Sequence, residues 1–268
     1  MSERPSTVRR RNGLASATPL RGGPILLLPT PIGRIVLWTV IAWYATLLLP
    51  SVTGRGPLYN DLTFVPVEFL SRLEEGQIFQ ALIPLFGHIF LHDPRPSFGL
   101  LPSAHLVFNM MWLVVFGSGI ARRLCVEGES LRDSSFNVFL FVMFYLASGV
   151  AGGLTHFAFH SLETVGLVGA SGAISGLMGG TLRFALRLFA PNGAGYGRLA
   201  PLWARPVLVA SAIYIGINIS TGLAAAAGVQ EAVQIAWEAH IGGFIFGLVA
   251  FPFFDRFAKR PPLPFGLG

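Results

Sequence analysis

Charge and cysteine are scarce in this chain. Of its 268 residues only 12% are Asp, Glu, Lys or Arg, whereas 53% are hydrophobic, and a single lysine stands beside 18 arginines. The one cysteine, Cys125, excludes an intramolecular disulfide as a source of stability. Soluble domains carry about twice this share of charge, and disordered chains carry far fewer apolar residues. The composition therefore indicates a protein that crosses a membrane several times.

The first 31 residues contain no apolar run long enough for a secretory signal peptide. They are polar and rich in Arg and Pro, and their apolar stretch at 25–28 is shorter than the core of such a signal. We expect residues 1–31 to form a flexible cytoplasmic tail and residues 257–268 to form a second one. A bacterial inner membrane is the simplest location. Because the Arg-rich tail has only one acid, Glu3, an organelle membrane is the alternative.

Six apolar segments follow, each close to the roughly 20 residues that a helix needs to cross the hydrocarbon core. Sixteen basic residues, Arg183 and Arg187 among them, fall on the side of the two tails, and only three fall on the other. The positive-inside rule therefore places both termini in the cytoplasm and the 53–99 connection outside. The net charge of +6 comes from these flanking residues and not from a basic patch, which excludes a nucleic-acid partner. We predict an all-α, six-transmembrane-helix bundle over residues 32–256, with segments at about 32–52, 100–121, 136–159, 166–186, 206–224 and 234–254.

Polar side chains recur near the outer ends of the second, fourth and sixth segments. In this topology the three segments run from outside to inside, and His105, Ser171 and His240 each lie about five or six residues below the outer boundary. At 1.5 Å of rise per residue, their common depth is roughly 8–10 Å. Asn109 lies one turn beyond His105 on the same helix face. Ionisable residues inside a membrane usually serve a function, so we expect a site here.

A serine beside a histidine is the pairing of a nucleophile with its general base. Ser171 would attack a carbonyl as His240 takes its proton, and His105 and Asn109 would donate hydrogen bonds to the oxyanion. Glu238 cannot orient the ring of His240, because side chains two residues apart on a helix point about 200° away from each other. No other third member is evident in the sequence. Asn218 only weakens the hydropathy of the fifth segment, so we predict a dyad.

Glycines border both members of this pair. Gly169 and Gly172 enclose the serine, and Gly243 and Gly247 form a Gly-x-x-x-Gly face below the histidine. Small faces let transmembrane helices approach closely. Such motifs are also common in transmembrane helices that pack together and have no catalytic role. Beside a serine and a histidine at matched depth, we interpret them as bringing the two side chains within hydrogen-bond reach.

These motifs resemble those of the rhomboid family of intramembrane serine proteases. The resemblance implies a water-filled cavity open to the outside, where Ser171 and His240 cut single-pass transmembrane helices near their outer end in the lipid bilayer. It implies His105 and Asn109 as oxyanion donors. We expect neither a cofactor nor a metal. The matching motifs, in order on alternate segments, are His105-Leu106-Val107-Phe108-Asn109-Met110, Gly169-Ala170-Ser171-Gly172 and Ala239-His240-Ile241-Gly242-Gly243-Phe244 with Gly247.

The chain departs from the family pattern upstream of the second segment. Pro84-Leu85-Phe86-Gly87-His88 resembles a family segment whose histidine often lines the oxyanion region. Sixteen residues separate His88 from His105, more than the family usually has, so His92 is an equal candidate for that role.

A second departure lies one turn below Ser171, where the family often has an aromatic residue that stacks on the catalytic histidine. Here that position is Ser175. The packing of the His240 ring must therefore come from elsewhere in the chain.

We weigh two other functions and one additional site against an active protease. An inactive relative that escorts client proteins would have lost Ser171 or His240, and both are present. A transporter would show repeated halves with broken helices, and the sequence shows no convincing repeat. The i,i+4 pair of His156 and His160 could hold a metal, but no obvious carboxylate or thiol accompanies it at that spacing. We therefore expect this pair to be structural or solvated.

Overall fold

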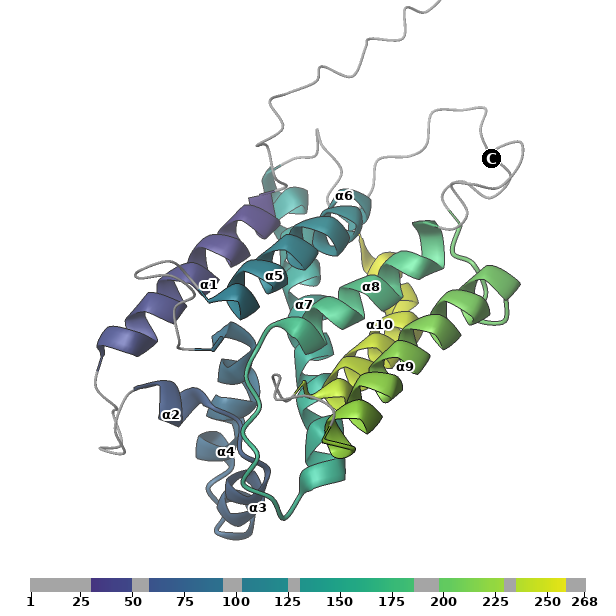
Figure 1. Ribbon diagram of the computed structural model, residues 1–268. Helices are drawn as coiled ribbons and strands as arrows, with labels where there is room; N and C mark the ends of the chain where they lie inside the picture. Colours follow the sequence, from purple (N-terminus) through teal and green to yellow (C-terminus); the bar gives the residue numbers. More distant parts are fainter. Residues whose placement is uncertain are drawn as a thin grey trace, which may run out of the picture.

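The computed structural model describes residues 30–49, 58–93, 103–124, 131–185, 198–228 and 235–258, and these residues are almost entirely helical (Figure 1). The second predicted segment forms one continuous helix in three parts, because a π-helical turn, η2, joins α5 to α6. The longer helices are α1 (Thr30–Leu48), α5 (Ala104–Trp112), η2 (Leu113–Gly117), α6 (Ser118–Leu124), α7 (Leu131–His160), α8 (Ser171–Ala185), α9 (Arg205–Ala226) and α10 (Trp237–Phe257).

Each of the six predicted segments contains a helix, but only four helices of the described chain are long and apolar enough to cross a membrane. These are Ala104–Leu124, Ser135–His160, Arg205–Ala226 and Trp237–Phe257. The protein is thus an integral membrane protein. The apolar part of α1 is Ile32–Thr46, which is shorter than these four helices. Helix α8 has 15 residues, which gives a length of about 22 Å against a hydrocarbon core of about 30 Å.

The start of α8 corrects the predicted segment at 166–186. The chain does not enter a helix at residue 166, because Leu167 pairs with Phe64 in an isolated antiparallel bridge. Gly169 then adopts φ +125°, a backbone conformation that favours glycine. Helix α8 begins at Ser171. The prediction that Ser171 lies about five residues inside a helix was therefore wrong.

Helices α7, α8 and α10 pack against one another at the centre of the molecule (Figure 1). A Cβ at Gly172 would lie 3.4 Å from the carbonyl oxygen of Ala239, and one at Gly176 would lie 3.0 Å from that of Gly243. From the other side, a Cβ at Gly243 or Gly247 would overlap the main chain of α8. The predicted small-residue faces are thus the surfaces along which the backbones of α8 and α10 touch.

The 53–99 connection, expected as an external loop, is largely helical in its described part. Its helices lie together at one end of the bundle (Figure 1). Phe64 and Leu85 form an apolar cluster there with Leu167 and Ala239. This connection thereby contacts both the segment that precedes α8 and the first turn of α10. Its elements are α2 (Leu58–Leu62), α3 (Pro66–Glu74), α4 (Ile78–Gly87) and the 3₁₀ turn η1 (His88–Phe90).

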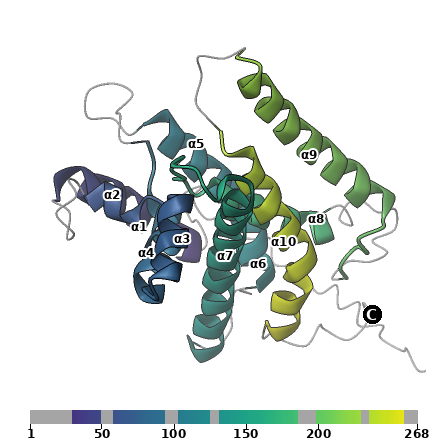
Figure 2. The same ribbon diagram turned by 90° about the horizontal axis from the view of Figure 1, so that it is seen from below.

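Helix α9 lies at the edge of the molecule, beside α10 (Figure 2). Only 11% of its most apolar window is buried, against 33–44% for the other three spans. Its buried residues are Val207, Ser211 and Asn218. Two of the three are polar, so the inner face of this helix is suited to hydrogen bonding as well as to hydrophobic packing.

Candidate active site

Three helices begin at the candidate site. His105 is the second residue of α5, Ser171 is the first of α8 and His240 is the fourth of α10. The site therefore lies where three helices start, and His105, Ser171 and His240 are held by first turns rather than by helix middles.

Ser171 and His240 are in direct contact. The serine Oγ lies 2.8 Å from Nε2 of the histidine. On its other side, His240 Nδ1 lies 2.9 Å from Oδ1 of Asn218 on α9. Since an amide oxygen only accepts hydrogen bonds, the proton of the neutral ring lies on Nδ1. Nε2 is then free to accept the proton of the serine hydroxyl, which is the arrangement of a nucleophile and its base.

Asn218 is the residue that sequence reasoning missed. Its side chain also donates from Nδ2 to the carbonyl oxygen of Tyr214, 2.9 Å away, which holds the amide with its oxygen toward the ring. The available signal was a buried amide in an otherwise apolar segment, and polar groups at membrane depth usually have a partner. Glu238, which the helical angle directs away from His240, contacts His156 instead.

An aromatic residue from α9, Tyr214, lies beside Ser175. The Tyr214 hydroxyl lies 2.6 Å from the Ser175 Oγ, and its ring stacks on Phe244 with centroids 4.5 Å apart. Ser175 in turn donates to the carbonyl oxygen of Ser171 over 2.6 Å. Tyr214 therefore connects Ser175, one turn beyond Ser171, with Phe244, one turn beyond His240.

His105 presents a hydrogen-bond donor to the segment before Ser171. Its Nδ1 accepts from the main-chain N–H of Asp93 over 3.3 Å, so the proton of the neutral ring lies on Nε2. This edge of the ring faces Gly169, where an added Cβ would lie 2.9 Å from Cε1 and 3.0 Å from Nε2. The side chain is thus positioned to donate beside the nucleophile.

Asn109 lies on the same helix as His105 and is buried. Its Nδ2 donates to the carbonyl oxygen of His105 over 2.8 Å, and its Oδ1 has no hydrogen-bond partner among the described residues. An amide nitrogen carries two hydrogens. One is engaged within the helix, and the other is available to a further acceptor.

The two upstream histidines occupy different environments. His88 donates from Nδ1 to the carbonyl oxygen of Pro84, 3.2 Å away, and its ring packs on Phe64. Its main-chain carbonyl accepts from the N–H of Gly169 over 2.9 Å. The ring of His92, by contrast, lies 5.1 Å from that of His105. Burial lowers the pKa of His88 to about 4 and that of His92 to about 3, so both rings are neutral at physiological pH.

A family model named Rhomboid domain matches residues 80–256, which is more than half of the chain. The protein belongs to the rhomboid family. This family is one of intramembrane proteases that act on membrane proteins within the bilayer. The match runs from α4 to the last turn of α10 and so includes every residue of this rhomboid's candidate site. No curated protein matches the sequence.

Proposed function

We propose that this rhomboid is an active serine endopeptidase that cleaves transmembrane helices through Ser171 and His240. The observation that carries the proposal is the continuous chain of two hydrogen bonds, from the Ser171 hydroxyl to His240 and from His240 to Asn218. It supports the tautomer in which Nε2 can accept a proton. A nucleophile, a base and an orienting group in this order are the requirement for covalent catalysis by serine.

The reaction follows from this tautomer. Ser171 Oγ adds to the scissile carbonyl carbon as its proton moves to Nε2 of His240, and a tetrahedral oxyanion forms. The imidazolium then gives that proton to the departing amine, and the acyl-enzyme remains. A water molecule, deprotonated by the same nitrogen, releases the carboxylate product and restores the hydroxyl.

Asn218 acts in this proposal as a positioning residue. Its oxygen holds the Nδ1–H of His240 throughout, so the ring cannot turn away from the serine. Because the amide is neutral, it does not offset the positive charge that the ring gains, as a carboxylate would. The site is therefore a dyad with an orienting amide, which refines the simple dyad expected from the sequence.

Three donors would bind the oxyanion. We assign them to the main-chain N–H of Ser171, to Nε2–H of His105 and to the second N–H of the Asn109 amide. The preorganised position of the first two matters most, since such donors stabilise charge only when they need no rearrangement. We assign His88 a different role from the one its motif suggested. Its carbonyl fixes Gly169, and the ring of His92 supports that of His105.

The substrate we propose is a single-pass transmembrane protein cut near its outer end. We propose six membrane-embedded helices in a bacterial inner membrane, and the charge distribution supports placing both termini in the cytoplasm. The site lies at the start of α5, α8 and α10, which is the outer end in this topology. A substrate helix must unwind there before its carbonyl can be attacked, because its backbone hydrogen bonds are internal.

Labelling with a serine-reactive fluorophosphonate tests this proposal. We expect the purified protein in detergent to be labelled on Ser171 and to cleave a reporter transmembrane substrate, and Ser171→Ala to lose both activities. Ser220→Ala is the matched control, since Ser220 is exposed on α9 and its hydroxyl, within the part of the chain that the structure describes, donates to the carbonyl oxygen of Gly216. Undiminished cleavage by Ser171→Ala would refute the assignment.

A further inference from the structure

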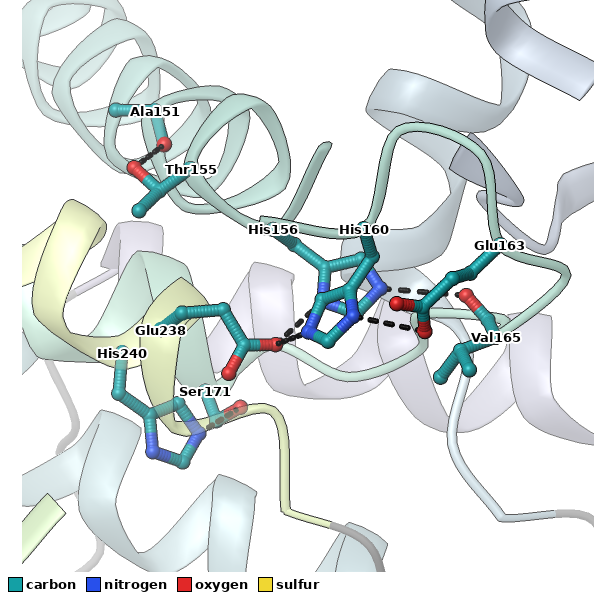
Figure 3. Close-up of polar contacts among 9 residues, drawn as sticks. All are labelled: Ala151, Thr155, His156, His160, Glu163, Val165, Ser171, Glu238 and His240. Atoms are coloured by element: carbon teal, nitrogen blue, oxygen red, sulfur yellow. Dashed lines mark hydrogen bonds and ion pairs between the residues drawn. The ribbon is translucent and has the colours of Figure 1, made fainter. Parts of the chain in front are cut away.

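A second polar cluster lies on the opposite side of the first turn of α10 from the catalytic histidine (Figure 3). Helix α7 contributes His156 and His160 at its end, and α10 contributes Glu238. Glu163 joins them from the segment that connects α7 to Ser171. One nitrogen or oxygen atom from each of His156, His160 and Glu238 lies within 4.8 Å of the others.

Both nitrogens of the His156 ring face hydrogen-bond acceptors. Nε2 lies 3.2 Å from the carbonyl oxygen of Val165, and Nδ1 lies 2.6 Å from Oε1 of Glu238. A neutral imidazole carries only one N–H. If it donates to the Val165 carbonyl, Nδ1 keeps a lone pair directed at the carboxylate.

The ring of His160 is in the same situation. Its Nδ1 lies 3.0 Å from Oε2 of Glu163, and its Nε2 lies 3.3 Å from the same Oε1 of Glu238. Two imidazolium ions would satisfy all four contacts. The two ring centroids are only 4.7 Å apart, and like charges at that separation oppose one another. One divalent cation among the two lone pairs and the carboxylate satisfies them without this repulsion.

We propose that His156 Nδ1, His160 Nε2 and Glu238 Oε1 bind one zinc ion, with water as the fourth ligand. Two imidazoles and a carboxylate form a known zinc ligand set. The remaining ring nitrogens already donate to Val165 and Glu163, which is how metal-binding histidines are usually oriented. Tetrahedral bonds of about 2.0–2.1 Å place ligand atoms about 3.3 Å apart. The His160–Glu238 distance already has this value, and the His156–Glu238 pair needs to open by less than 1 Å.

The position of the site explains what the ion does. It joins the end of α7 to the first turn of α10, two residues before His240. Its outer ligand partners belong to the segment that leads into Ser171. The ion therefore fixes, from outside the catalytic pair, the two chain segments that deliver the nucleophile and the base. The 28% exposed side chain of His160 gives the ion a path from solvent, whereas those of His156 and Glu238 are 2% and 3% exposed.

Zinc retention by the purified full-length protein tests this inference. After incubation with zinc and removal of the free ion, we expect about one zinc per chain by mass spectrometry. His160→Ala and Glu238→Gln should lose it. Ser171→Ala should keep it although it is inactive, so failure of the zinc site and failure of the proposed protease function give different results.

A cysteine variant separates loss of a ligand from loss of the fold. His160→Cys preserves a zinc ligand, so it should retain the metal. With cobalt in place of zinc, it should also show a thiolate-to-cobalt absorption that the unmodified protein lacks. Glu163→Ala should weaken zinc binding by about 10–100-fold through its histidine, and Glu68→Ala, an exposed glutamate on α3, should not. Absence of bound zinc in the unmodified protein, or equal zinc in His160→Ala, would overturn the site.

Discussion

Helix α10 carries His240 and helix α9 contacts it through Asn218, but the two helices are held in opposite ways. Helix α10, which carries His240, touches α8 along the glycine face of Gly243 and Gly247, where no additional carbon fits. Helix α9 carries Asn218, and only 11% of its most apolar window is buried. At Gly216 of α9, an added Cβ would meet no atom within 4 Å.

The comparison separates two requirements of the site. The distance from Ser171 to His240 depends on backbone contact between α8 and α10. The orientation of the His240 ring depends on side chains from a helix with little packing of its own. Changes in α10 should therefore damage the fold and activity together, and changes in α9 should alter catalysis with little cost in stability.

The largest effect concerns the pair itself. We expect His240→Ala to lower kcat on the order of 10⁶-fold, as removal of one member of a serine–histidine unit does. The Ser171→Ala/His240→Ala double variant should be hardly slower than either single variant, because the two act as one unit. Cleavage of a reporter substrate in proteoliposomes measures both. If the loss in the double variant equals the product of the two single losses, the residues act independently.

The next largest effect contrasts the two helices directly. Gly247→Ala should destabilise the protein by about 1–3 kcal/mol, the usual effect of overpacking, and should reduce activity by separating α10 from α8. Gly216→Ala, the same change on α9, should leave stability equal or slightly higher, since alanine favours helices. Thermal unfolding in detergent measures both. Equal unfolding temperatures for the two variants would contradict the contrast.

A smaller effect is expected at Asn218. Asn218→Ala frees the His240 ring to turn, and a misplaced catalytic group costs up to about 10²-fold in rate. We expect kcat to fall, with KM and unfolding temperature little changed. Ser220→Ala on the same helix serves as control. A rise in KM alone would instead place Asn218 in substrate binding.

The smallest effect lies one turn away from the catalytic pair. Tyr214→Phe keeps the stacking on Phe244 and removes one neutral hydrogen bond to Ser175, worth about 0.5–1.5 kcal/mol. Activity should fall by about two- to tenfold. Ser175→Ala should cost more, because it also removes the hydrogen bond that Ser175 donates to the carbonyl oxygen of Ser171. The double variant should be little slower than Ser175→Ala alone, because Ser175→Ala already breaks the contact with Tyr214.

The contact between Ser171 and His240 was easier to predict from the sequence than the residues around it. Matched positions on alternate segments suggested that His105, Ser171 and His240 meet, and the structure places them together. Asn218 and Tyr214 could not be predicted in the same way. A helix that is apolar on nearly all sides gives no periodicity from which to infer which face turns inward.

Contacts between distant segments account for the other differences. Residues 166–170 are apolar enough to extend a predicted helix, but pairing of Leu167 with Phe64 keeps them extended. Glu238 reaches His156 across 82 positions of sequence, so local spacing could not reveal it. Arg183, expected among the inner flanking charges, is buried and donates to the carbonyl oxygens of Ala200 and Leu248.

The convergence of three helix starts has an electrostatic consequence. The first turns of α5, α8 and α10 each carry a partial positive charge of about half a unit from aligned peptide dipoles. Together they form a field that favours negative charge beside Ser171, and the carboxylate of Glu238 in the first turn of α10 opposes part of it. In the proposed reaction, this field would stabilise the oxyanion and would also attract the carboxylate that hydrolysis creates. The fragment that carries the new carboxylate should therefore leave the site more slowly than the fragment that carries the new amine.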